Sequence, residues 1–434
     1  MLKKGIGELL TGGRAVKTLA VGCVAAAMIA GAALGISAAA GTSVAAADSS
    51  ESGSGLTVKT YLSDWEKYKD EYPDQVNSFA SGLTDYESVD GKAHSHATMY
   101  AKLAAQENES SSEINAPWGG VYCSSCKSTA SLSYIEEYGV TGLHAEWPGA
   151  ANISWFDCAL CHENGEPGAA LTYGAGPANL FATGLLDSVP AEDAVCGQCH
   201  NGFADRYCKD AIYDSLASGE KSVDDVDPYR YGYTPEDIMK ASFEDGYEWA
   251  LLDEESGIPK FVGTYFTIEL YQGSTHEELG VTCVDCHMGT KTNEDGEEYT
   301  SHDFSSTPLS TTDNDEMMTY CLTCHASQGI SDAEGMREFI VEAEEELAAL
   351  EQTFLDKEAQ LYDLIVAAAS DESFDQDVLD DARYSYAVAD FYYRYAQGST
   401  EELGQTVAHN PEMTRSYVEQ ATVMIDDAIA TMNA

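Results

Sequence analysis

The clearest pattern in the chain is an apolar repeat near its C-terminus. Residues 332–369 contain no proline, and four apolar residues recur there at intervals of seven: Ile340, Leu347, Phe354 and Leu361. Three more occupy the matching offset positions: Ala343, Leu350 and Leu364. This spacing, which Lys357 interrupts, is typical of one long helix whose apolar stripe packs against a partner helix. The partner is either another part of this chain or a second copy of it.

Two further segments, residues 376–397 and 411–432, have the pattern of helices. Between residues 56 and 330 the apolar runs are short, turn-forming residues are frequent and helical periodicity is sparse. We therefore expect a C-terminal helical part, residues 331–434, that packs on a less regular domain, residues 61–330.

The first 47 residues have the pattern of an export signal. Basic residues precede an uncharged apolar stretch, residues 19–40, and small residues then lead to Asp48. The apolar stretch is also long enough to span a bilayer, so a cleaved signal (residues 1–47) and a retained membrane anchor both stay open. We expect residues 48–60 to form a flexible linker. We expect the rest of the chain to work outside the cytoplasm, in the periplasm or at the outer face of the cell membrane.

Charge is the most unusual feature of the composition. The 434 residues include 74 Asp and Glu against 22 Lys and Arg, which gives a formal net charge of −52. Such a surface repels phosphate groups, which excludes nucleic-acid binding and membrane binding through basic patches. The charge instead favours partners that carry positive charge. Apolar residues make up 44% of the chain, enough for a packed core.

Ten of the twelve cysteines fall into one repeated motif. They form five Cys-x-x-Cys pairs: Cys123/Cys126, Cys158/Cys161, Cys196/Cys199, Cys283/Cys286 and Cys321/Cys324. Four pairs are followed at once by histidine: His162, His200, His287 and His325. The first pair is followed by Lys127. Cys-x-x-Cys-His is the attachment motif of c-type haem, in which two thiols bond to the porphyrin edge and the next side chain ligates the iron.

Structural zinc and disulfide bonds are the competing interpretations. Zinc would use two pairs for each tetrahedral site, which leaves one pair over and does not explain the histidines. Disulfides are common in exported chains, but they do not explain the histidines either. We therefore predict five covalently bound haem c groups, with Cys208 left unpaired and structural. Because the porphyrins supply apolar surface, the segment with weak periodicity should not fold without them.

The remaining histidines cover the distal iron ligands that such haems need. Six lie outside the motifs: His94, His96, His144, His276, His302 and His409. Four histidine-ligated haems that only transfer electrons would each need one of them, so two are to spare. Lys127 is different, because an amine must lose its proton to bind iron. If no sixth protein ligand is supplied, that iron is open to a substrate and is catalytic, with the other haems as its electron relay.

These motifs resemble a known family. One lysine motif followed by four histidine motifs is similar to the ammonia-forming cytochrome c nitrite reductases, as are C-G-Q-C-H at residues 196–200 and V-T-C-V-D-C-H-M at residues 281–288. The likeness runs from residue 90 to the C-terminus. It implies a mainly α-helical multihaem cytochrome c fold with few strands, a haem-packed core and long C-terminal helices that usually form a homodimer.

The resemblance also implies ligands and partners. The positions that match the family's distal ligands are His302 for the second haem, His96 for the third, His409 for the fourth and His276 for the fifth. A membrane-bound multihaem cytochrome that oxidises quinol would donate the electrons. A small molecule would accept them at the Lys127 haem, and the family's own acceptor is nitrite, which it reduces to ammonia.

The pocket around the open haem departs from the family pattern. The family places an arginine, a tyrosine and a histidine there, beside a calcium site. In this sequence no arginine lies at residues 15–205, no Val-Glu-Tyr run follows His200, and Tyr265 stands where the histidine belongs. Lys102 and Tyr265 are the nearest candidates to supply a cation and a proton. The calcium ligands are lost with the pocket, which argues against calcium.

These features are compatible with two functions, an enzyme that reduces an acceptor and a protein that only transfers electrons. The retained lysine motif favours a terminal reductase of nitrite or another small acceptor. The missing pocket favours an electron-transfer cytochrome that passes electrons to a separate reductase or to an extracellular acceptor. The sixth position on the Lys127 iron discriminates between them, because its occupation by His94 or His144 would exclude the enzyme. A vacant position that binds cyanide or nitrite would favour the enzyme.

Overall fold

The computed structural model of the chain describes residues 161–162, 171, 185–202, 215, 218–222, 224–244, 251–260, 266–288, 290–292, 296, 298–300, 315–398 and 403–434. All of them belong to the larger of the two units into which the chain divides, Ser54–Ala434. The predictions for the export signal, the linker and the first haem motif lie outside the described residues.

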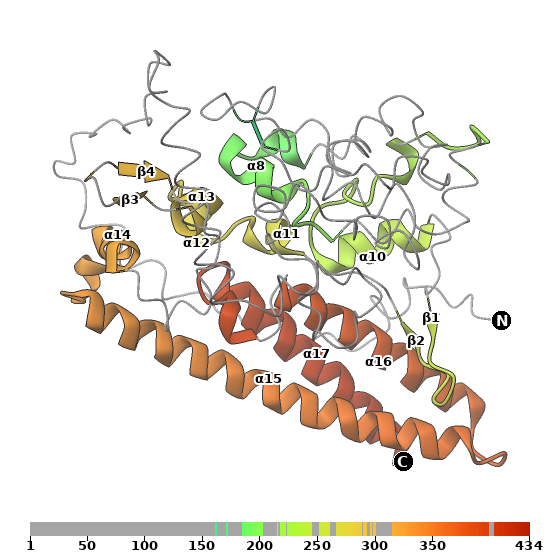
Figure 1. Cartoon of the computed structure of the whole chain (residues 1–434). Coiled ribbons are helices and arrows are strands. Elements are labelled where there is room, and N and C mark those ends of the chain that lie inside the picture. The colour runs from blue at the N-terminus through green and yellow to red at the C-terminus, as the bar shows by residue number, and fades with distance from the viewer. Residues whose placement is uncertain are drawn as a thin grey trace, which may run out of the picture. The chain divides into compact units, whose positions relative to one another are not determined.

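Helices account for most of the described elements (Figure 1). In chain order, with η for a 3-10 helix, the elements are η8 (Leu186–Ser188), α8 (Ala191–Gly197), η10 (Asp224–Val226), α10 (Pro235–Glu244), β1 (Leu251–Leu252), β2 (Pro259–Lys260), α11 (Thr267–Tyr271), α12 (Thr275–Glu278), α13 (Cys283–His287), β3 (Thr290–Thr292), β4 (Glu298–Thr300), α14 (Asp315–His325), η12 (Ala326–Gln328), α15 (Ala333–Ala369), α16 (Gln376–Gln397), η13 (Leu403–Thr406) and α17 (Pro411–Met432). The strands form two antiparallel hairpins, β1 with β2 and β3 with β4. The predicted mainly α class is confirmed. No helix in the part of the chain that the structure describes is both long and apolar enough to cross a membrane.

The three C-terminal helices lie where the sequence predicts them, and they pack side by side (Figure 1). Each begins at an N-cap whose side chain accepts a backbone N–H: Asp332, Asp375 and Asn410. Pro411 suits the first position of α17, where no intrahelical donor is needed. Gly398 follows α16 with a φ of 61°, a left-handed conformation that favours glycine.

The seven-residue stripe of α15 packs within the chain. Three of its residues, Leu347, Phe354 and Leu361, are buried in the same core cluster as residues of α16 and α17. Ile340, nearer the start of the helix, packs with methionines of α14. Lys357, which interrupts the apolar pattern, forms an ion pair with Asp426 of α17. Of the two partners that the sequence left open for this stripe, the structure therefore selects the same chain.

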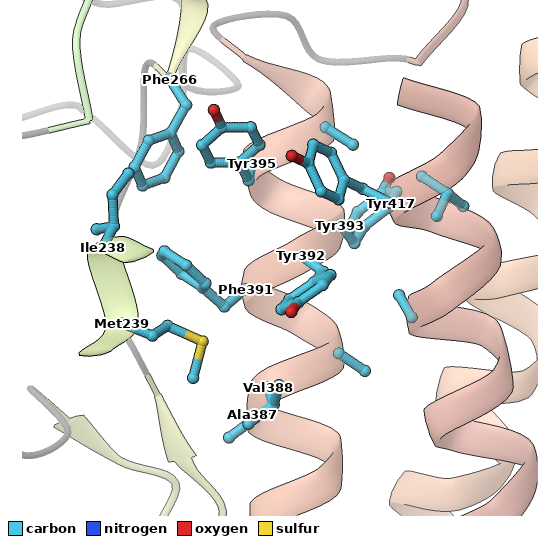
Figure 2. Packing of buried hydrophobic residues seen from close by; sticks show 14 of the residues in the cluster. Ile238, Met239, Phe266, Ala387, Val388, Phe391, Tyr392, Tyr393, Tyr395 and Tyr417 are labelled. Carbon is cyan, nitrogen blue, oxygen red and sulfur yellow. The ribbon is translucent and has the colours of Figure 1, made fainter. Parts of the chain in front are cut away.

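Aromatic rings join α16 to the irregular part of the chain. Figure 2 shows Phe391 and Tyr395 of α16 beside Phe266, which directly precedes α11. The ring centre of Phe266 lies 5.4 Å from that of Phe391, edge-on, and 5.0 Å from that of Tyr395. Such contacts add to the free energy gained by burying the rings. The C-terminal helices and residues 266–271 thus share one core, while the domain boundaries stay a prediction.

Candidate haem sites

Two of the five motifs lie on helices, and a third begins on one. The third begins on α8 with Cys196, α13 consists of the fourth motif, and α14 ends with the fifth. Residues three and four positions apart share one face of a helical turn, which brings both thiols and the imidazole of a motif to one porphyrin. Of the second motif, Cys161 and His162 are described, and His162 pairs with Leu171 in an isolated β-bridge.

The third motif runs past the end of its helix. Gly197 is the last residue of α8, so Cys199 and His200 both lie beyond it. The backbone N–H of Cys199 donates to the Cys196 carbonyl at 3.1 Å, and the His200 N–H donates to the same carbonyl at 2.9 Å. Both cysteines are half-buried. The helical turn therefore continues to the histidine, so the backbone keeps Cys196, Cys199 and His200 on one turn. The bonds of the two thiols to haem stay a prediction.

The histidine of the fourth motif lies close to its expected distal partner. The ring centres of His287 and His409 are 6.2 Å apart, and the rings are 24° from parallel. Two imidazoles on opposite sides of one metal ion have centres roughly 6.4 Å apart, because a metal–nitrogen bond is about 2.0 Å long and the ring centre lies about 1.2 Å beyond the nitrogen. The observed separation matches this value.

The fifth motif shows the same arrangement. The ring centres of His325 and His276 are 6.3 Å apart, with the rings tilted by 55°. His276 Nδ1 lies 2.8 Å from the backbone oxygen of Ala408, and His325 Nδ1 lies 3.1 Å from Oε1 of Gln328. An acceptor at Nδ1 keeps the proton there and leaves Nε2 available to a metal. The residues of this site therefore fit a haem with two histidine ligands.

The backbone around His409 is held from both sides. Asn410 donates from Nδ2 to the Leu270 carbonyl at 2.9 Å, while its Oδ1 caps α17 by accepting the Met413 N–H at 3.2 Å. On the other side of His409, the Ala408 carbonyl accepts from His276. The residues on both sides of His409 are thus tied to α11, α12 and α17.

Burial keeps the imidazoles of His200 and His409 neutral. It lowers the pKa of His409 to about 3 and that of His200 to about 4. The neighbouring imidazoles act in the same direction, His287 on both residues and His276 on His409, because positive charges at close range repel. The neutral form is the one that ligates a metal, so these histidines are ready to bind iron at physiological pH.

The structure reveals a buried carboxylate between two motifs that sequence reasoning missed. Asp193, on α8, is 1% exposed, and its Oδ1 accepts the backbone N–H of Cys283 at 2.6 Å. Burial raises the pKa of this carboxyl. The hydrogen bond ties the helix of the third motif to the first residue of the fourth. Asp193 therefore fixes the spacing of the two attachment helices.

A second missed carboxylate lies beside the third motif. Glu269 is 2% exposed and accepts the Gly202 N–H at 2.7 Å and the hydroxyl of Tyr229. Burial raises its pKa to about 7. Among 74 acidic residues, no motif or spacing marks the few that are buried, so the sequence carries no signal for either carboxylate.

The other predicted site residues lie outside the described part of the chain: Lys102, Cys123, Cys126, Lys127, Cys158, Tyr265, His96, His302 and the spare histidines His94 and His144. Their roles stay predictions. Within the described ranges, no group of three or more His, Cys, Asp or Glu side chains is arranged to hold a metal ion. Cys196, Cys283, Cys286, Cys321 and Cys324 form no disulfide bond.

Sequence relatives carry the name cytochrome c-552. The protein of that name from Haemophilus influenzae is 25% identical over 312 residues, which cover 60% of this chain and 55% of the relative. The one from Haemophilus ducreyi is 27% identical over 243 residues, which cover 53% of this chain and 44% of the relative. The chain thus spans about half the length of the curated relatives it matches.

A solved structure and a family model extend the likeness. The cytochrome c nitrite reductase from Desulfovibrio desulfuricans aligns with a TM-score of 0.56 and 17% identity, over 73% of this chain and 67% of that one. At this identity the likeness concerns the fold, and it confirms the expected multihaem cytochrome c class. The family model described as Cytochrome c552 matches residues 48–434, and a cytochrome c family implies covalently bound haem c. Since this match covers most of its length, the chain belongs to the cytochrome c552 family.

Proposed function

We propose that this chain is an extracytoplasmic pentahaem cytochrome that reduces a small acceptor at its lysine-ligated haem. The observation that carries the proposal is the pairing of two motif histidines with separate histidines, at 6.2 Å for His287 and His409 and at 6.3 Å for His325 and His276. These are the separations that two axial ligands of one iron would have. The name of the structural neighbour, a nitrite reductase, makes nitrite the first acceptor to consider.

The chain's own residues divide into two roles. Haem c supplies iron that gains and loses single electrons. Paired imidazoles would close four of the sites to other ligands and so reserve them for electron transfer: His162 with His302, His200 with His96, His287 with His409, and His325 with His276. Lys127 would ligate the first iron through a neutral amine and leave the opposite side to the acceptor.

The residues around the open site select the acceptor. An anionic acceptor such as nitrite needs a cation to hold its oxygens and a group that donates protons. We assign these roles to Lys102 and Tyr265. The net charge of −52 opposes the entry of anions, so a small neutral acceptor such as hydroxylamine is the alternative for the same site.

A second candidate function rests on the sequence of the pocket. The absence of the family's arginine, tyrosine and histidine favours an electron-transfer protein without reductase activity. In both cases we propose a membrane-bound, quinol-oxidising multihaem cytochrome as the electron donor. Its docking surface should be basic, because complementary charge accelerates the encounter with an acidic partner.

Reoxidation of the reduced holoprotein separates the two functions. After anaerobic reduction with dithionite, we expect nitrite or hydroxylamine to reoxidise the haems much faster than buffer alone, and cyanide to abolish the fast phase by occupying the open iron. Tyr265→Phe should slow that phase by about 100-fold, since a positioned proton donor contributes at least that much. Intact mass should show five haems in each preparation. If no acceptor exceeds the buffer rate, the reductase is excluded and the electron-transfer function remains.

We also propose that the chain forms a homodimer through an outward row of α15. The inner stripe is used within the chain, but Val341 and Leu355 are 37% and 36% exposed. They lie two heptads apart, with the exposed Ala348 between them, so all three share one side of the helix. An apolar row of this kind suits the same row of a second copy.

Charges in this row should separate the subunits. We expect the double replacement of Val341 and Leu355 by glutamate to convert the dimer to a monomer, because two like charges would meet across the two-fold axis in an apolar contact. Light scattering coupled to size-exclusion chromatography measures the mass. Val423→Glu, at a residue of α17 that is 58% exposed, is the matched control and should leave the dimer intact. A wild-type protein that is monomeric at all concentrations would refute the dimer.

A further inference from the structure

The fifth haem motif differs from the fourth in the groups that support its histidines. His325 Nδ1 lies 3.1 Å from the side-chain oxygen of Gln328, and His276 Nδ1 lies 2.8 Å from the backbone oxygen of Ala408. Both imidazoles of this pair therefore have an oxygen acceptor. At the fourth motif, the buried Nδ1 of His409 has no hydrogen-bond partner among the described residues. The distal histidines of the two sites thus differ in the hydrogen bond at Nδ1.

The backbone holds Gln328 over His325. Gln328 ends η12, a 3-10 turn that begins directly after His325, and side chains three residues apart eclipse in such a turn. The Ser327 hydroxyl donates to the Cys324 carbonyl at 2.8 Å and closes the same turn. Gly329 follows with a φ of 94°, a left-handed conformation that turns the chain away. The side-chain oxygen is therefore directed at the imidazole although Gln328 is exposed.

We infer that Gln328 is a positioning residue that lowers the reduction potential of the fifth haem by accepting the Nδ1–H of His325. A histidine that ligates through Nε2 carries its proton on Nδ1, so the amide must present its oxygen there. An acceptor at this position fixes the orientation of the ring and makes the imidazole a stronger electron donor. A stronger donor stabilises the ferric state relative to the ferrous state, which lowers the potential.

The inference rests on the haem attachment proposed above and is independent of acceptor reduction. A midpoint potential is measured without any acceptor, so the loss of the reductase proposal would leave it standing. An intact mass that lacks one haem, with the fifth motif empty, would overturn the inference by itself. The two proposals therefore fail on different observations.

Two replacements of Gln328 should shift one potential in opposite directions. Gln328→Leu removes the acceptor at similar size, and we expect the midpoint potential of one haem to rise. Gln328→Glu supplies a stronger, charged acceptor, and we expect the same potential to fall. Spectroelectrochemical titration of the holoprotein at neutral pH, with electron paramagnetic resonance to identify the haem, should show the other four potentials unchanged.

Matched controls separate the hydrogen bond from a general charge effect. Gln352 is an exposed glutamine on α15, 13 residues beyond Phe339, whose ring centre lies 5.4 Å from that of His325. That offset corresponds to about 20 Å along the helix. Gln352→Leu and Gln352→Glu should leave all five potentials in place. High salt, which screens charges through solvent, should leave the rise in Gln328→Leu intact. If neither Gln328 variant shifts a potential, or both shift it in the same direction, the inference is wrong.

Discussion

His409→Ala should convert one of the five proposed haems from low spin to high spin. The ring centre of His409 lies 6.2 Å from that of His287. If the two rings ligate the fourth iron as we propose, the loss of His409 would remove the sixth ligand. The high-spin fraction should rise by one haem, and the potential of that haem should rise because an electron-donating ligand is gone. Electron paramagnetic resonance of the oxidised holoprotein counts the low-spin centres directly.

His409→Met is the matched control for that experiment. Methionine offers a sulfur ligand at the same position, so the fourth haem should stay low spin while its potential rises, as methionine ligation does in cytochromes c. Asn410 would still cap α17 and bond to Leu270 in both variants, which keeps the loop in place. Unchanged low-spin content in His409→Ala would show that another group ligates this iron and would refute the assigned pair.

Phe391→Ala should cost about 3–5 kcal/mol of the free energy of unfolding, the usual range for a buried phenylalanine. Phe391 is 0% exposed, and its ring meets Phe266 edge-on at 5.4 Å (Figure 2). Phe266 in turn packs against Gly202, where an added Cβ would lie 1.9 Å from that ring. Because Gly202 follows His200 by two residues, the cavity should also loosen the third haem site.

Urea titration of the holoprotein, followed by circular dichroism of the helices, measures this cost. Val423→Ala provides the control, since Val423 is 58% exposed and its truncation should change the unfolding free energy by less than about 0.5 kcal/mol. A cost below about 1 kcal/mol for Phe391→Ala would mean that the core closes around the missing ring. In that case the contact between Phe391 and Phe266 would not be needed to hold the third motif in place.

Features that depend on local spacing can be recognised in the sequence. Cys-x-x-Cys-His predicts haem attachment, because two thiols and an imidazole reach one porphyrin from a single helical turn. Heptad spacing and the absence of proline predicted the long helix that the structure shows as α15, and the neighbouring patterns predicted α16 and α17. Local backbone geometry sets these periods, so a short window of residues is enough to recognise them.

Tertiary structure alone decided which distant groups meet. An apolar stripe predicts that a helix packs against a partner helix. Only the tertiary structure shows that the partners of α15 are helices of the same chain. His409 was matched to the fourth haem only by resemblance, and its distance to His287 follows from a loop held by α11 and α12. No sequence pattern marks Asp193 or Gln328, because neither belongs to a motif. Their roles become visible only from the hydrogen bonds that they make in the folded chain.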